Sequence, residues 1–198
     1  TSQIENLVDY FDNRSIATTV TREPGGTKIG SKIRSILLNP EHKDLSPTAE
    51  LLLYMADRAQ HIDTTIKPAL REGRTVICDR YADATVVYQG YARGLPPDLM
   101  HQLHQLLFEN LKPDLTLLLD VDPRIGLSRA WNQLDSGDRD RAEGRFEEEA
   151  LAFHERVRAG YLKLARIESE RFRIVDAAQD EKAVWEEICA ILDQQLKG

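Results

Sequence analysis

Four short apolar runs alternate with longer amphipathic stretches along this chain. The runs lie near residues 16, 75, 115 and 172, and apolar side chains recur at helical spacing between them. This alternation is typical of parallel strands that are joined by helices, which then cover both faces of the sheet. The run Leu115–Val121 is unbroken, as expected of a strand that is buried on both faces. The sequence therefore predicts an α/β fold with a parallel sheet.

Proline and polar side chains indicate where the helices begin and end. Ser46-Pro47 is a favourable start for a long helix that should reach about Lys67, where Pro68 breaks or kinks it. Another long helix is expected over residues 146–168. The chain also begins inside a helical pattern, because apolar residues recur on one face over residues 1–11.

Length and charge limit the classes of protein that fit. The 198 residues suit one domain with a sizeable core. A formal net charge of −7 argues against a general nucleic-acid binder, but it permits a small anionic substrate because local field matters more than total charge. No apolar run approaches the length of a membrane span, and no signal peptide is visible. The two cysteines lack metal-ligand spacing and fit a reducing cytoplasm.

An acid and a base end the second apolar run. Asp79 and Arg80 directly follow the β-branched stretch that starts at Thr75. In open α/β sheets, ligands bind at the carboxyl ends of the strands. The pair could therefore offer a carboxylate for a metal ion and a guanidinium for a phosphate, side by side. The alternative is an ordinary salt bridge at the end of a strand.

Two further stretches add to a phosphate-handling inventory. Gly25-Gly26 forms a turn directly after the strand expected over Ile16–Val20, where the backbone can approach a ligand. Tyr54 and Arg58 are four residues apart and share a helix face. They could stack on a nucleobase and hydrogen-bond its carbonyl edge, or they could be a half-buried aromatic residue and a solvated charge.

The arginine-rich segment from Asp135 to Arg145 has no apolar core of its own. Such a segment is often a solvated loop. Placed over transferring phosphates, it could instead close as a lid that excludes water and supplies an arginine in cis. Together with the preceding features, this order of elements predicts a phosphoryl-transfer enzyme.

Seven stretches in this order carry a resemblance to one family. The chain resembles the bacterial branch of the thymidylate kinases at residues 21–27, 51–61, 66–70, 78–81, 88–90, 113–121 and 153–161. The first reads Thr-Arg-Glu-Pro-Gly-Gly-Thr and the fourth Cys-Asp-Arg-Tyr. The resemblance covers nearly the whole chain and is specific to this family rather than to nucleotide kinases in general.

The resemblance implies a three-layer α/β/α fold of the P-loop NTPase type, with a five-stranded parallel sheet. It implies one nucleoside-monophosphate-kinase domain over residues 1–198, with a lid at about 132–146. The implied reaction transfers the γ-phosphoryl group of ATP, with magnesium, to thymidine monophosphate (dTMP) for dTTP biosynthesis. A cytoplasmic homodimer without nucleic-acid or membrane partners is implied as well. Two alternatives stay open: a non-catalytic nucleotide-binding module, or another nucleoside or nucleoside-monophosphate kinase.

The resemblance also implies roles for individual residues. Tyr54 falls where the family stacks an aromatic ring on thymine, and Arg58 matches the arginine that hydrogen-bonds the base. Arg80 and Arg34 match phosphate-binding arginines, and Asp79 matches an acid that is linked to the metal. Further implied substrate contacts are Arg22, Gly26, Thr85, Gln89 and Tyr161.

The lid motif is less regular than elsewhere in the family. Bacterial members carry Asp-Arg-x-Glu just before the long helix, and Gly144–Glu147 is in register with it. Asp140–Glu143 fits the spelling but lies four residues early. We therefore expect Arg145 to be the catalytic, ATP-binding lid arginine, with Arg141 as the alternative.

The family's first strand and glycine-rich phosphate loop have no counterpart in the sequence. Thr1 aligns with the hydroxyl residue of that loop, which helps to hold ATP and magnesium. We expect a chain that starts at Thr1 to lack ATP turnover and to leave neighbouring strands unpaired. We also expect the natural protein to have residues before Thr1.

Overall fold

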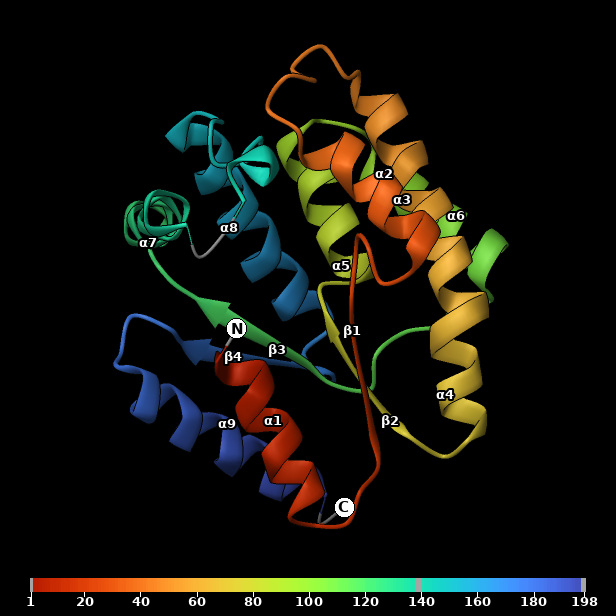
Figure 1. The fold of residues 1–198 in the computed structure, drawn as a ribbon, viewed down its shortest axis with the longest axis vertical. Coiled ribbons are helices and arrows are strands. Elements are labelled where there is room, and N and C mark those ends of the chain that lie inside the picture. Colours follow the sequence, from red (N-terminus) through yellow and green to blue (C-terminus); the bar gives the residue numbers. More distant parts are fainter. Residues whose placement is uncertain (1, 138–139, 197–198) are drawn as a thin grey trace. The chain divides into compact units, whose positions relative to one another are not determined.

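A computed structural model describes residues 2–137 and 140–196 of the chain (Figure 1). The chain separates into two compact units. The first contains Thr1–Leu111 and Arg141–Glu148, and the second contains Lys112–Asp140 and Glu149–Gly198. None of the described helices is long and apolar enough to cross a membrane.

The first unit is built on two parallel strands and a set of helices. Its elements are α1 Ser2–Asp12, β1 Thr18–Arg22, α2 Lys28–Leu38, α3 Pro47–His61, the π-helix η1 Ile62–Ile66, α4 Lys67–Arg71, β2 Thr75–Asp79, α5 Ala82–Thr85, the π-helix η2 Val86–Ala92, α6 Pro97–Phe108 and the 3-10 turn η3 Arg141–Glu143. Strands β1 and β2 pair in parallel from Thr18↔Thr75 to Arg22↔Asp79. The parallel arrangement is confirmed, although β1 begins at Thr18 and not at Ile16.

The long helical run does not end at Pro68. It passes from α3 through η1 into α4, which reaches Arg71. Proline has no N–H to donate and crowds the preceding turn, so a regular α-helix cannot continue through it unchanged. Here the preceding turn widens into η1, where the N–H of Lys67 donates to the carbonyl of Ile62. The expected kink is therefore a π-turn, and the expected end near Lys67 was too early.

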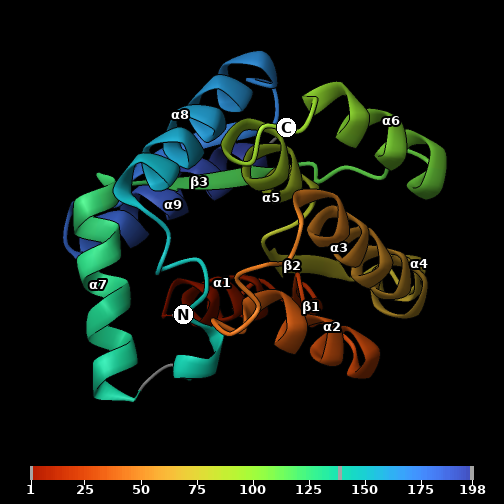
Figure 2. The same cartoon turned by 90° about the horizontal axis from the view of Figure 1, so that it is seen from above.

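The buried face of this run anchors the core of the first unit. Its apolar residues pack with others from η2 and α6, and the cluster is Leu51, Met55, Ile62, Ile66, Val86, Met100 and Phe108. The neighbouring helix α2 lies beside α3, as the second view also shows (Figure 2). The first turn of α3 is capped by Ser46, whose hydroxyl accepts from the N–H of Ala49. The long helix is therefore fixed both along its face and at its start, and this holds Tyr54 and Arg58 in place.

The second unit also contains a parallel strand pair. Its elements are β3 Thr116–Asp120, α7 Pro123–Ser136, α8 Leu151–Ile167, β4 Phe172–Asp176 and α9 Glu181–Gln195. Strands β3 and β4 pair from Thr116↔Phe172 to Asp120↔Asp176. Helices α8 and α9 lie on opposite sides of this pair (Figure 1). The predicted covering of both faces is confirmed for these two strands.

Two expectations for this part of the chain were wrong. Helix α8 begins at Leu151 rather than at Phe146. Phe146 belongs to the first unit, where its ring packs edge-on against Tyr88 with centroids 5.3 Å apart. Strand β3 is half-buried rather than fully buried, and the Leu119 side chain is 42% exposed. Among the described strands, β3 pairs along one edge only, with β4.

Candidate active site

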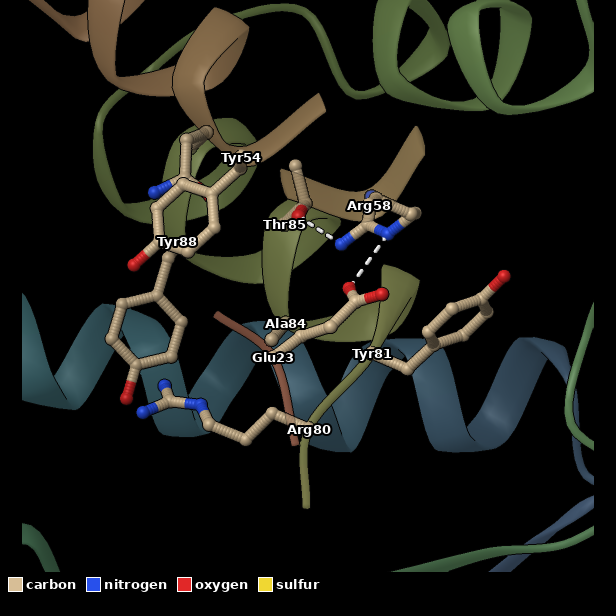
Figure 3. Close-up of a pocket in the computed structure, with 9 residues that line it drawn as sticks. Glu23, Tyr54, Arg58, Arg80, Tyr81, Ala84, Thr85 and Tyr88 are labelled. Carbon is tan, nitrogen blue, oxygen red and sulfur yellow. Dashed lines mark hydrogen bonds and ion pairs between the residues drawn. The ribbon is translucent and has the colours of Figure 1, made fainter. Parts of the chain in front are cut away.

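The first unit contains a pocket at the carboxyl end of β2. It is lined by Glu23, Tyr54, Arg58, Arg80, Tyr81, Ala84, Thr85, Tyr88 and Gln89 (Figure 3). These residues come from the turn after β1, from α3, from the edge after β2, and from α5 and η2. Five of the residues expected from the sequence converge here: Tyr54, Arg58, Arg80, Thr85 and Gln89. The other four were not expected.

Arg58 forms the buried end of the pocket. Arg58 is only 1% exposed, so the alternative interpretation of this residue as a solvated charge is wrong. The guanidinium Nε donates to Glu23 Oε2 at 2.9 Å, and Nη2 donates to Thr85 Oγ1 at 2.8 Å (Figure 3). A buried charge is tolerated only when it is paired and hydrogen-bonded, and Glu23 supplies the opposite charge.

The same carboxylate is bonded to a histidine that the sequence did not assign to any site. His61 Nδ1 lies 2.8 Å from Glu23 Oε1, and His61 Nε2 lies 2.6 Å from Thr21 Oγ1. All three side chains are buried. A signal did exist, because His61 follows Arg58 by three residues on one helix face. Glu23, in contrast, is 35 residues away from Arg58, and no local pattern predicts their contact.

Gln89 is held from behind by a second buried carboxylate. Its amide nitrogen donates to Glu50 Oε1 at 2.8 Å, and both residues are almost completely buried. The amide of Gln89 is therefore oriented before any ligand arrives. Because one N–H of Nε2 is already used for Glu50, the carbonyl oxygen and the second N–H of the amide remain for a ligand.

Two tyrosines and Arg80 form the opposite side of the pocket. The Arg80 guanidinium carbon lies 4.4 Å from the centre of the Tyr88 ring (Figure 3). Burial raises the pKa of Tyr54, so its hydroxyl stays protonated and available as a donor. The cavity has a volume of about 10 Å³, which is room for about one water molecule, so a larger ligand requires lining side chains to move.

Arg80 also has an unusual backbone. Its φ of 66° lies in the left-handed region, which a residue with a Cβ adopts only at a cost. Strain of this kind concentrates at functional sites, where the surrounding structure holds it. Arg80 itself is exposed, at the end of β2.

The turn after β1 holds Arg34 and excludes larger residues at Gly26. Arg34 donates from Nε and Nη2 to the two carboxylate oxygens of Glu143, both at 2.7 Å, and from Nη1 to the carbonyl of Pro24 at 3.0 Å. A Cβ at Gly26 would lie 2.6 Å from Thr21 Oγ1 and 2.8 Å from His61. Gly26 is thus required for packing around the histidine. Arg22 is exposed and lies opposite Asp79 in the strand register.

The two candidate lid arginines have different surroundings. Arg145 is 4% exposed, and it donates to the carbonyl of Leu37 and to Glu50 Oε2. Its guanidinium also lies over the Phe146 ring, 4.6 Å from the centroid. Arg141, in η3, is exposed. Arg145 therefore lies in the interior of the first unit, and it does not line the pocket.

Three candidates remain. Asp79 is exposed at the end of β2, and its carbonyl accepts from the N–H of Glu23 at 3.0 Å. Tyr161 belongs to α8 in the second unit, and Thr1 lies outside the described residues. Within residues 2–137 and 140–196, no group of three or more His, Cys, Asp or Glu side chains could hold a metal ion. Asp79 fits only as one oxygen ligand of a magnesium ion that takes its other ligands from phosphate and water.

Known proteins similar to this chain agree with one another. The family profile described as thymidylate kinase matches residues 1–188. A thymidylate kinase of Desulfosudis oleivorans is 54% identical over 177 residues, which are 89% of this chain and 83% of that protein. One of Desulforapulum autotrophicum is 50% identical over 99% of this chain and 86% of its own length. The crystal structure of thymidylate kinase from Ehrlichia chaffeensis superposes with a TM-score of 0.74 at 28% identity, covering 97% of this chain and 90% of that one.

Proposed function

Because the chain belongs to the thymidylate kinase family, we propose that its pocket binds dTMP and that the enzyme transfers the γ-phosphoryl group of ATP to it. The chain is thus a phosphotransferase with an α/β fold of the P-loop type. The observation that supports the substrate most directly is the convergence of Tyr54, Arg58, Thr85 and Gln89 on one cavity that opens beside Arg80. Nothing favours a non-catalytic module or a kinase for another nucleoside.

The buried part of the pocket suits a pyrimidine with carbonyl groups. Arg58 presents a guanidinium, whose N–H groups are donors only, and carbonyl oxygens are their natural partners. Tyr54 and Tyr88 supply aromatic surfaces for stacking. A base with an amino group at the same position would leave buried polar groups unpaired, and such mismatches discriminate strongly. Thymine therefore fits this chemistry better than cytosine.

The exposed part of the pocket suits the acceptor phosphate. Arg80 follows the carboxyl end of β2, where ligands bind in α/β sheets. Two further guanidinium groups come from Arg22, at the end of β1, and from Arg34, in the helix α2 that follows. Guanidinium forks bind phosphate oxygens in pairs and neutralise the charge that develops during transfer. These residues would orient the acceptor oxygen toward the donor.

ATP and magnesium complete the proposed reaction. Magnesium, when bound, would neutralise phosphate charge, and Asp79 is the acid that we assign as its ligand, with Thr1 as a second one. Of the two lid arginines, Arg141 is exposed, whereas Arg145 is buried and would first have to leave Glu50. We therefore favour Arg141 as the arginine that reaches ATP, and assign Arg145 to the structure of the first unit. The contact of Tyr161 with the sugar stays a prediction from the family resemblance.

The reaction is tested with a coupled assay for ADP release. The full-length protein is supplied with ATP, magnesium and, in turn, the monophosphates of thymidine, deoxyuridine, deoxycytidine and deoxyadenosine. We expect dTMP to give the highest kcat/KM. Equal rates with all four acceptors would refute the proposed substrate.

We further propose that the protein is a cytoplasmic homodimer. Each chain would form one catalytic domain, with a lid at about residues 132–146. Exposed leucines support a contact between copies, because Leu106 is 80% exposed on α6 and Leu52 is exposed on α3. Sedimentation of the full-length protein should give the mass of two chains. Leu106→Glu, which places a charge on this surface, should shift the protein toward one chain.

A further inference from the structure

Arg58 is bonded to Glu23 and Thr85, and Glu23 is bonded in turn to His61, which contacts Thr21. We propose that Glu23, held by His61, is a positioning residue that fixes the guanidinium of Arg58 and so sets the preference for a base with a carbonyl group facing it. The proposal rests on the proposed function, since it concerns how the same pocket selects dTMP. Neither Glu23 nor His61 would need to touch the substrate.

The geometry leaves Arg58 little freedom. Glu23 Oε2, in the turn after β1, accepts from Nε, and Thr85 Oγ1, in α5, accepts from Nη2 (Figure 3). Among the described residues, Nη1 has no hydrogen-bond partner, and Arg58 lines the pocket. Two fixed nitrogens determine the plane of the guanidinium, because the group is rigid and planar. The N–H groups of Nη1 and the second N–H of Nη2 are therefore the donors that this arrangement leaves for a ligand.

Glu23 is itself held at its other oxygen. His61 Nδ1 contacts Oε1 at 2.8 Å, while His61 Nε2 contacts the Thr21 hydroxyl at 2.6 Å. A neutral imidazole that donates from Nδ1 and accepts at Nε2 satisfies both contacts. The carboxylate thus cannot rotate away from Arg58 without losing a second buried hydrogen bond. A series of hydrogen bonds therefore extends from β1 to the pocket, through Thr21, His61, Glu23 and Arg58.

The charged groups of Glu23 and Arg58 are paired. The two residues form an ion pair with both side chains almost fully buried. The adjacent Asp57 is also buried, and burial together with the charge of Glu23 raises the pKa of its carboxyl. Removal of one member of a buried pair leaves the other unpaired, which is costly. The cluster therefore favours a single arrangement of its side chains.

A fixed donor discriminates between pyrimidines, whereas a mobile donor does not. Thymine carries a carbonyl oxygen at C4, and cytosine carries an amino group there. A guanidinium N–H that is held in place donates to the carbonyl oxygen of thymine, but it meets the amino group of cytosine donor to donor. If the guanidinium could turn aside, that mismatch would cost less. Loss of Glu23 should thus reduce discrimination, and not merely weaken binding of both ligands.

The test measures binding of dTMP and of deoxycytidine monophosphate (dCMP) by calorimetry to the full-length protein. We expect the wild type to prefer dTMP, and Glu23→Gln to reduce the ratio of the two dissociation constants by about tenfold or more, as expected for a charged hydrogen bond. His61→Leu should reduce the ratio in the same direction. His61→Gln, which keeps an amide donor, should retain most of it.

The matched control is Glu168→Gln, which removes a partly buried carboxylate that pairs with Arg171 and Lys112 in the second unit. It should leave the ratio unchanged. A wild type without preference for dTMP would refute the proposed function. A wild type that discriminates, with an unchanged ratio in Glu23→Gln and His61→Leu, would refute only the positioning role. If Glu23→Gln does not fold, the two His61 variants decide.

Discussion

The buried and exposed parts of the pocket hold their arginines in different ways. In the base-facing cluster (Glu23, Arg58, His61 and Thr85), every partner is buried and the guanidinium is fixed. We assign Arg34 and Arg80 to the acceptor phosphate and call them the phosphate-facing arginines. Their partners include groups that a ligand could replace: the carboxylate of Glu143 and the ring of Tyr88. Folding has already ordered the base-facing cluster, so binding there costs little conformational entropy. The phosphate-facing arginines must exchange their partners on binding.

The largest expected effect tests whether the base-facing cluster is structural as well as functional. Arg58→Ala leaves Glu23 buried without its ion-pair partner, and we expect the free energy of unfolding to fall by about 3–5 kcal/mol. Urea denaturation measures this loss. Arg80→Ala is the counterpart on the exposed side, and it should change stability by less than about 1 kcal/mol.

A double variant sharpens this prediction. Replacing both partners, as in Arg58→Met with Glu23→Leu, removes the unpaired charge and should recover much of the lost stability. Equal stability of the wild type and Arg58→Ala would show that the buried pair does not constrain the fold. In that case the contrast between the two parts of the pocket would disappear.

The next effect concerns turnover at the exposed side. Arg80→Ala removes a charged phosphate contact, and we expect kcat to fall by about 10²–10³-fold, in the range seen when one preorganised donor is removed from an active site. Steady-state kinetics with dTMP would measure it. Arg80→Lys keeps the charge without the planar fork, and its kcat should lie between those of the wild type and Arg80→Ala. Unchanged kinetics in a folded Arg80→Ala protein would remove Arg80 from the acceptor site.

Local spacing predicted the parts of the site that lie on one element. Tyr54 and Arg58 were placed on one helix face by their four-residue separation, and both line the pocket. Asp79 and Arg80 were placed at a strand end, where β2 does end. The parallel pairing of both strand pairs followed from the alternation of strands and helices. These features depend on periodicity, which is a property of neighbouring residues.

Contacts between distant residues were not predictable in this way. Arg145 is bonded to Glu50, 95 residues earlier, and nothing in its own segment distinguishes a buried arginine from an exposed one. Glu23 reaches Arg58 and His61 only because the turn after β1 packs under α3. The π-turn before Pro68 is a similar case, because the sequence showed that the helix had to change but not how.

A smaller effect is expected from a change at Tyr54, which we propose to stack on the base. Tyr54→Ala should weaken dTMP binding by about 1–3 kcal/mol, the usual contribution of an aromatic ring stacked on a base. Calorimetry measures the dissociation constant directly. Tyr54→Phe keeps the ring and should bind dTMP nearly as well as the wild type. If Tyr54→Ala binds dTMP as tightly as the wild type, Tyr54 does not stack on the base.

The smallest expected effect tests whether the phosphate-facing arginines are held by replaceable partners. The Arg34–Glu143 pair is partly exposed, with side chains 16% and 28% accessible, so the pair contributes at most about 1 kcal/mol. Glu143→Gln removes the charge that competes with a phosphate for Arg34. We therefore expect dTMP to bind up to about fivefold more tightly. Thymidine, which lacks the phosphate, should bind the variant and the wild type equally.

Glu148→Gln is the matched control, because Glu148 lies in the same segment but pairs with Lys43 on the surface. It should leave both affinities unchanged. Tighter binding of thymidine as well as dTMP would mean that Glu143 acts on the shape of the pocket and not through Arg34. Weaker binding of dTMP would mean that Glu143 orients Arg34 for its ligand, as Glu23 does for Arg58, and the two parts of the pocket would then follow one principle.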